Sequence, residues 1–334
     1  YYTMNDIDKE TLRKYRQIFE IRNDGHVWNS LDDKLFLEKL GGYRRDRRDG
    51  KEGLTLAGLL MFGDGLAIRD EFDNIFMDYR NETQVTADIR WNDRITYDGT
   101  WENNLFNFFT KVTPKLTEDL KKPFKLEGIQ RIDETPVHKA VREAFVNLII
   151  HADYLSDAGI LKIIKRSDEF EFTNPGILKL PVEDIYRGGN SKSRNPRMQT
   201  MLRMVGFGDN AGSGFPAILA TWKEKGWIEP ILEEDTNLNQ VTLTLKMITK
   251  SAGKSAGKSA GKSAGKSADE FIAMTKRHQQ ILELMDNNVE YSSEEIASLI
   301  GLKGSRTRQL LKELVDLKKL TCTSAAKRRK YKKA

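Results

Sequence analysis

The segment REAFVNLIIHADY, residues 142–154, carries the side chains best suited to chemistry in this chain of 334 residues. Glu143, Asn147 and His151 are spaced four residues apart, so on a helix they lie along one stripe. Apolar residues cover the other faces, which predicts a helix buried on most sides. Buried polar groups need partners. Two interpretations are open: a satisfied network inside the core, or a carboxylate, an amide and an imidazole that line a cavity.

These residue types suit a phosphate ester bound together with a divalent cation. Mg²⁺ takes hard oxygen ligands, often only one or two of them from the protein, and the amide oxygen of Asn147 would serve. Glu143, one turn earlier, is placed to orient or deprotonate a water molecule that attacks a γ-phosphate. The spacing alone favours the satisfied core network, and the segments that follow in the chain decide whether these roles as metal ligand and catalytic base apply.

Donors for anionic oxygens follow later in the chain. Gly212, Ser213 and Gly214 precede a predicted helix, so their backbone N–H groups would lie at the positive end of its dipole. The loop 186–196, YRGGNSKSRNP, is too rich in glycine and polar residues for regular structure and adds cations. These cations are Arg187, Lys192 and Arg194.

The remaining pattern mixes helices and strands, and Thr135-Pro136 suits the first turn of the central helix. Further helices are predicted at 6–22, 31–43, 54–63, 100–121, 196–205 and 215–225. Strands are predicted at 74–80, 86–96, 160–165, 169–173, 228–233 and 238–247. The charged segment 43–53 is either a solvated loop or a contact for nucleic acid.

Composition places the chain among soluble globular proteins, with 39% hydrophobic and 31% charged residues. The chain shows no apolar run of membrane-spanning length and no signal-peptide pattern. Its single cysteine excludes an intrachain disulfide, which agrees with a cytoplasmic location. Residues 251–334 hold 18 Lys+Arg against 9 Asp+Glu, whereas residues 1–250 hold 37 against 40. We therefore expect an anionic polymer to bind residues 251–334.

A flexible cationic linker is predicted at 251–268, where the sequence SAGK repeats. Its GKS triplets do not form a P-loop, because successive glycines are four residues apart and no apolar strand leads in. Beyond it, helices at 270–286, 293–300 and 305–318 and a basic tail predict a winged helix-turn-helix. The residues suited to contact double-stranded DNA are Ser305, Arg306, Arg308, Gln309, Lys312, Lys327, Arg328 and Arg329. A protein-binding winged helix is the alternative.

The order of the motifs from 141 to 214 resembles the Bergerat-type (GHKL-type) ATPase fold of gyrase, mismatch-repair ATPases, heat-shock chaperones and sensor histidine kinases. More closely, VREAFVNLIIHADY, FTNPGIL, RNP and GSGF resemble the ATP-binding domain of bacterial proteins labelled RecG-like helicases or transcriptional regulators. YRRDRRDGKEGLTLAGLLMFG is similar to the end of the Schlafen-type AlbA domain that usually precedes it. The helicase label itself has no support, because the chain lacks a P-loop motor.

The resemblance implies a nucleotide-binding role for particular residues. They are Asn147, His151, Asn174, Gly176, Arg194, Asn195, Gly212, Ser213 and Gly214. Position 174 is Asn where typical members have Asp, and its amide oxygen accepts a hydrogen bond from adenine less strongly than a carboxylate does.

An α+β architecture follows: an AlbA-like N-terminal α/β region over 1–125, a Bergerat-type α/β sandwich over 126–250, the linker, and a winged helix over 269–334. The expected function is that of a transcription regulator that binds ATP, Mg²⁺ and DNA and whose nucleotide state modulates DNA binding. If the protein is a homodimer, its two winged helices would contact a two-fold DNA site. The alternatives are a slow ATPase in DNA remodelling or repair, with Glu143 as its catalytic residue, and a binding module with a degenerate pocket.

Overall fold

The protein is described by a computed structural model, in which the chain divides into two compact units, residues 1–260 and 261–334. In the first unit the structure describes residues 2–72, 75–86, 89–121, 126–127, 130–131, 134–156, 159–190, 192–208 and 214–249. In the second it describes residues 281–282, 284–285, 289, 291–300, 307, 310–311, 314–315, 319–322 and 330–333.

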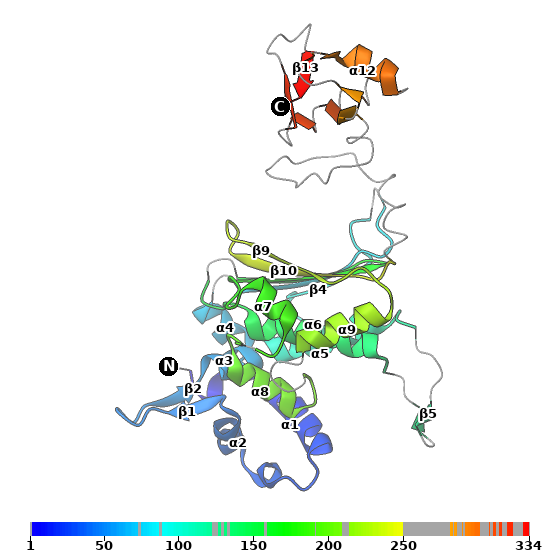
Figure 1. The fold of residues 1–334 in the computed structure, drawn as a ribbon. Coiled ribbons are helices and arrows are strands. Elements are labelled where there is room, and N and C mark those ends of the chain that lie inside the picture. Colours follow the sequence, from blue (N-terminus) through cyan, green and yellow to red (C-terminus); the bar gives the residue numbers. More distant parts are fainter. Residues whose placement is uncertain are drawn as a thin grey trace. The chain divides into compact units, whose positions relative to one another are not determined.

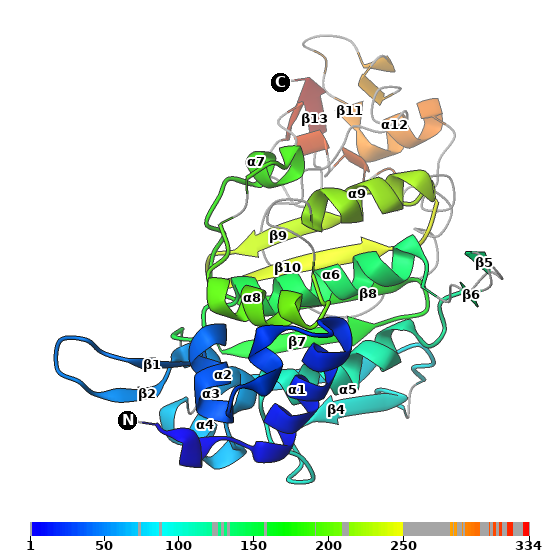
Figure 2. The same ribbon diagram turned by 90° about the horizontal axis from the view of Figure 1, so that it is seen from below.

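A six-stranded mixed sheet forms one layer of the first unit, and the prediction of an α+β fold is confirmed (Figures 1 and 2). Strand β3 runs parallel to β7, whereas the other neighbours are antiparallel. In spatial order the strands are β4 (Asp93–Thr96), β3 (Phe76–Asn81), β7 (Ile160–Lys165), β8 (Glu169–Pro175), β10 (Gln240–Lys246) and β9 (Ile231–Asp235). Two strands from before residue 100 thus complete the sheet.

The two faces of the sheet differ because side chains alternate along each strand. Tyr79, Ile163, Phe172 and Leu243 lie in register across four strands and are buried under helices on one face. The other face carries ion pairs between strands, such as Lys162 with Glu171 at 3.3 Å. Figure 1 shows α5 (Leu105–Thr117), α6 (Pro136–His151) and α9 (Gly214–Glu224) together on one side of the sheet.

Helix α6 is the predicted central helix, and it begins as its sequence indicates. Thr135 is the N-cap, accepting a hydrogen bond from the His138 N–H, and Pro136 occupies the first turn. Ten of its side chains are buried, among them Phe145, Leu148 and Ile149. The helix ends at His151, after which Ala152 turns into an extended conformation.

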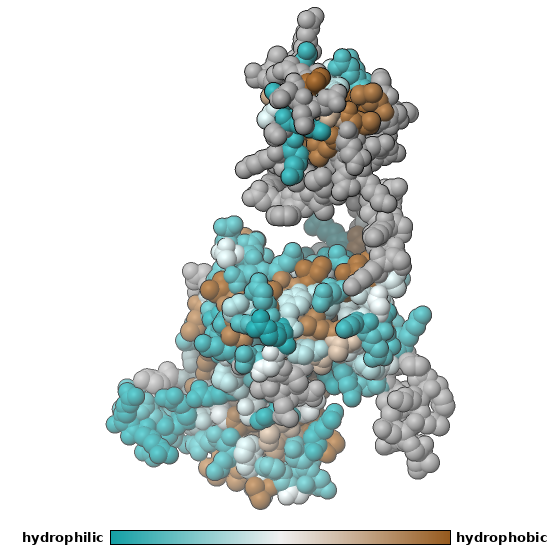
Figure 3. All heavy atoms as spheres, viewed as in Figure 1, coloured by the Kyte–Doolittle hydropathy of each residue, from teal (hydrophilic) through white to brown (hydrophobic). Residues whose placement is uncertain are grey.

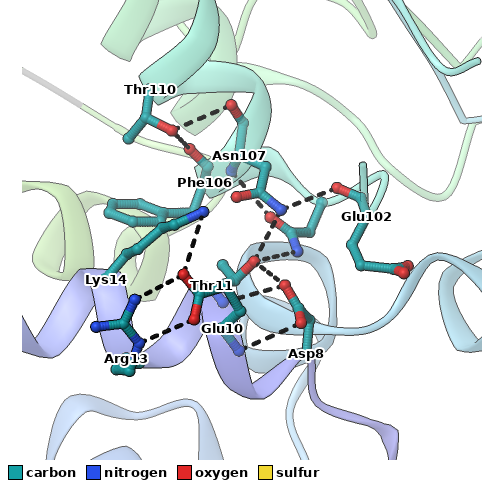
Figure 4. A network of polar contacts seen from close by, with 10 residues as sticks. Asp8, Glu10, Thr11, Arg13, Lys14, Glu102, Phe106, Asn107 and Thr110 are labelled. Atoms are coloured by element: carbon teal, nitrogen blue, oxygen red, sulfur yellow. Dashed lines mark hydrogen bonds and ion pairs between the residues drawn. The ribbon is translucent and has the colours of Figure 1, made fainter. Parts of the chain in front are cut away.

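The N-terminal helices share one hydrophobic core with the sheet. They are α1 (Lys9–Arg22), α2 (Asp33–Leu40), α3 (Leu56–Phe62) and α4 (Gly65–Glu71), with short 3-10 turns at Met4–Asp6 and Val27–Ser30. A buried polar network joins α1 to α5 (Figure 4): the side-chain amides of Asn104 and Asn107 both donate to the Thr11 hydroxyl, at 3.1 and 2.8 Å. This contact attaches α1 firmly to the helix layer.

The charged segment 43–53, predicted as a loop, forms the sides of a hairpin. Strand β1 (Tyr43–Arg45) pairs antiparallel with β2 (Glu52–Leu54), and the hairpin projects from the body with a hydrophilic surface (Figures 2 and 3). Strands β5 (Leu126–Glu127) and β6 (Gln130–Arg131) form a second short hairpin.

In the second unit the described residues comprise helix α12 (Ser293–Ile300) and a three-stranded sheet. Strand β13 (Lys330–Lys333) lies between β11 (Tyr291–Ser292) and β12 (Leu320–Cys322). A small core including Ile296, Leu311 and Leu314 holds them together. Helix 293–300 is confirmed. The residues predicted to contact DNA, Ser305, Arg306, Arg308, Gln309, Lys312, Lys327, Arg328 and Arg329, lie outside the described residues.

Candidate functional site

The polar stripe of α6 forms one wall of a cavity. Between Val141 and Ile150 the side chains are buried except for Arg142, Glu143 and Asn147, and His151 follows as a partly exposed residue. Glu143, Asn147 and His151 all line the same cavity, hereafter the α6 cavity. The four-residue spacing therefore places three different functional groups at one surface.

The floor of the α6 cavity is the helix-covered face of the sheet. Phe172 and Asn174 come from β8, Val241 and Leu243 from β10, and Leu232 from β9. The cavity with its open mouth encloses about 1080 Å³ of space outside the protein atoms. Its lining combines apolar side chains with a few polar groups, as small-molecule sites do.

Helix α7 (Val182–Arg187) closes the far side and was not predicted from the sequence. Its Ile185 lines the cavity, and its Tyr186 hydroxyl donates to the Pro230 carbonyl at 2.7 Å and accepts from the Leu232 N–H at 3.1 Å. A signal was present: Pro181 followed by Glu183 and Asp184 is typical of a helix start.

The N-terminus of α9 meets the carboxylate of Glu143. Gly214 is the first residue of α9, and a Cβ atom at that position would overlap the Glu143 side chain. A larger residue at position 214 would therefore displace the Glu143 carboxylate from its place against α9. Gly214 also lines the α6 cavity, so the positive end of the α9 dipole lies at its edge. The other predicted residues of this turn, Gly212 and Ser213, lie outside the described residues.

His151 is held in its neutral form at the end of α6. Burial, reinforced by the positive charges of Arg194 and Lys179, lowers the pKa of His151 from 6.5 to about 4. At neutral pH the imidazole thus offers one donor and one acceptor to the cavity.

The Asn174-Pro175-Gly176 turn ends β8 beside the cavity. Asn174 is buried and lines the cavity, and its side-chain amide donates to the Pro175 carbonyl at 3.2 Å. Gly176 has a φ of +98°, a conformation that favours glycine. Gly176 itself is not among the described residues that line the cavity.

Arg194 and Asn195, also predicted to bind nucleotide, are engaged with the protein itself. Arg194 forms an ion pair with Asp153 at 3.1 Å and donates to the Ile177 carbonyl at 2.9 Å. The Asn195 amide donates to the Ala152 carbonyl at 2.7 Å, satisfying a carbonyl group beyond the end of α6. Neither residue is among the described lining of the α6 cavity.

Two lysines supply positive charge at the α6 cavity. Lys192, one of the predicted cations, lines the cavity and is exposed. Lys179 also lines the cavity and is exposed, although sequence reasoning did not single it out. Nothing in the sequence around Lys179 distinguishes it from other surface lysines. Arg187 pairs with Asp184 at 2.9 Å on the exposed side of α7.

Comparison with known proteins supports an ATPase-type domain at this site. Residues 161–245 match the family model described as "Putative ATP-dependent DNA helicase recG C-terminal". The matched range includes Asn174, Arg194 and Gly214 and begins after α6. Residues 1–78 match a model described as a domain of unknown function (DUF8451). The chain thus contains a region similar to the RecG C-terminal ATPase-type domain.

A solved structure shares the fold. The DIP2311 protein from Corynebacterium diphtheriae is similar with a TM-score of 0.53 and 14% sequence identity, over 99% of this chain and 68% of that chain. A search of curated proteins gave no match. Across the described part of the chain, none of the helices combines the length and apolar character that spanning a membrane requires.

Proposed function

We propose that this protein binds ATP with Mg²⁺ in the α6 cavity, and that nucleotide occupancy modulates DNA binding by its C-terminal part. The observation that carries the proposal is the stripe of Glu143, Asn147 and His151 on the wall of a cavity that also borders the start of α9 at Gly214. The family match over residues 161–245 supports a nucleotide as the ligand class.

The donor set of the α6 cavity fits a magnesium-bound nucleotide. The apolar floor suits a base, and the Asn174 amide beside it suits the amino group of adenine. The Asn147 oxygen would serve as a metal ligand, with phosphates and water completing the coordination. Gly214 at the start of α9, with Lys179 and Lys192, would hold the phosphates. The described lining therefore offers groups for the base, for the metal ion and for the phosphates of one nucleotide.

Calorimetry with Mg²⁺ and ATP tests this site directly. Wild-type protein should give a binding isotherm, and Asn147→Ala should weaken it by about tenfold or more, as loss of a metal-site partner does. The difference should disappear when EDTA replaces Mg²⁺. Asn237→Ala, an exposed asparagine in the β9–β10 turn, is the matched control and should bind as wild type. No heat with the wild type would overturn the proposal.

The proposed DNA-binding part is the basic segment 251–334, as a winged helix-turn-helix reader of double-stranded DNA. Its support is the excess of Lys and Arg over residues 251–334. A homodimer would present two readers to a two-fold site. Gel-shift titrations of the full chain with and without Mg²⁺ and ATP should give different DNA affinities. In Asn147→Ala the two affinities should converge, and equal affinities in the wild type would refute the coupling.

Slow ATP hydrolysis is the second candidate, and the position of Glu143 favours it. Its carboxylate lies at the cavity wall and against the first residue of α9, where a terminal phosphate would be held. Purified protein should then release phosphate, and Glu143→Gln should abolish the release while retaining nucleotide binding. A wild type that binds ATP without releasing phosphate would leave binding as the function.

A further inference from the structure

Three segments that are far apart in the sequence meet at the end of α6. The Asp153 N–H donates to the Pro175 carbonyl at 2.9 Å, which joins the end of α6 to the turn after β8. Arg194 then contacts both: Nη1 pairs with the Asp153 carboxylate at 3.1 Å, and Nη2 donates to the Ile177 carbonyl at 2.9 Å. One guanidinium therefore connects the end of α6 with the 174–177 turn.

Gly176 allows these segments to approach closely. A Cβ atom on Gly176 would lie 2.7 Å from the Asp153 Cβ and 3.4 Å from the Arg194 Nη2. The Gly176 N–H donates to the Asn239 carbonyl at 2.7 Å, which attaches the turn to the start of β10. The turn is thus held between β10 and the Asp153–Arg194 pair, with only a glycine fitting at its centre.

The backbone of the segment carrying Arg194 is itself fixed. The Asn195 N–H donates to the Ile150 carbonyl at 2.9 Å, and its side-chain amide donates to Ile150 and Ala152 at 3.2 and 2.7 Å. Lys192, two residues before Arg194, is exposed and lines the α6 cavity. The two cations of one loop therefore face different surroundings.

We infer that Arg194 is a positioning residue for the base-contacting side of the α6 cavity, whereas Lys192 faces the phosphates. Arg194 holds the 174–177 turn, and with it Asn174, against the end of α6. The planar fork of arginine reaches a carboxylate and a carbonyl at the same time, which a lysine ammonium does not reproduce. This assignment rests on the proposed nucleotide site and divides its cations into two roles.

Calorimetry with two probes separates these roles. Arg194→Ala should weaken the binding of adenosine and of magnesium ATP by the same factor, about tenfold, because a charge-assisted hydrogen bond is lost from the base side. Lys192→Ala should weaken ATP alone. Arg194→Lys should behave like Arg194→Ala, because charge without the fork does not hold the turn.

The ratio of ATP to GTP affinity is a second readout. Loosening the turn in Arg194→Ala should bring this ratio toward one, whereas Lys192→Ala should leave it as in the wild type. If Arg194→Ala does not fold, Asp153→Asn supplies the same test, since it weakens the ion pair without changing the size of the side chain.

The outcomes distinguish this inference from the proposed function. A wild type that binds neither ATP nor adenosine would overturn both. A wild type that binds ATP, together with an Arg194→Ala variant that loses ATP affinity while retaining adenosine affinity, would overturn the positioning role alone and make Arg194 a phosphate ligand.

Discussion

Replacing His151 with glutamine should remove a pH-dependent part of the stability of the first unit. Burial, with Arg194 and Lys179 nearby, lowers the pKa of His151 from 6.5 to about 4 in the folded protein. Between these two values the unfolded chain binds more protons than the folded one, so the free energy of unfolding rises with pH. The contribution of His151 is therefore fully present above pH 6.5 and is lost as the pH falls toward 4.

The size of the effect follows from the lowered pKa. One pKa unit corresponds to about 1.4 kcal/mol, so the whole contribution is about 3 kcal/mol, of which about 2 kcal/mol is lost between pH 7 and pH 5. Glutamine stays neutral over this range. The difference in unfolding free energy between wild type and His151→Gln should therefore shift by about 2 kcal/mol toward the variant at the lower pH.

Urea unfolding followed by tryptophan fluorescence is the appropriate assay. All five tryptophans, Trp28, Trp91, Trp101, Trp222 and Trp227, belong to the first unit, so the signal reports on the body that contains His151. Measurements at several pH values between 7.5 and 4.5 give the two curves. If they run parallel, His151 titrates alike in the folded and unfolded states, and its assignment as a neutral imidazole in the folded protein is wrong.

Two further substitutions test the packing of the N-terminal helices in the first unit. A change from glycine to alanine ordinarily stabilises a helix, but Gly58→Ala should destabilise the first unit by about 2 kcal/mol. The reason is that the added Cβ would overlap the backbone carbonyl of Gly42. A variant as stable as the wild type in urea would contradict this packing. Asn104→Ala should lower the unfolding free energy by about 2 kcal/mol, because it removes the α5 N-cap and the donors to Thr11 and Gly63. An unchanged urea midpoint would show that water replaces these contacts.

Much of the secondary structure could be predicted from local patterns. Strand Ile160–Lys165 follows its apolar run, and α6 begins at the Thr135-Pro136 signal. Helix α7 was missed because it is only six residues long and glycines follow it directly. A short segment of this kind is difficult to distinguish from a loop by its sequence. Its stability comes from the contacts of Tyr186 with residues 230 and 232, which no local pattern contains.

The candidate site divides in the same way. The spacing of Glu143, Asn147 and His151 places them on one side of a helix in any fold, because the helical repeat is a local property. The motif that contains Arg194 and Asn195 was also visible, but its surroundings were not. The side-chain hydrogen-bond and ion-pair partners of both residues lie at least 17 positions away and depend on how the strands pair.

By itself, the sequence determined which groups α6 presents together, because residues four apart on a helix share a face whatever surrounds them. Only the tertiary structure decided that this face borders a cavity and that Gly214 meets Glu143 there. It also decided that Arg194 contacts Asp153 and Ile177 rather than lining that cavity. These contacts depend on sheet register and on close backbone approaches between distant segments, and both arise only when the whole core has packed.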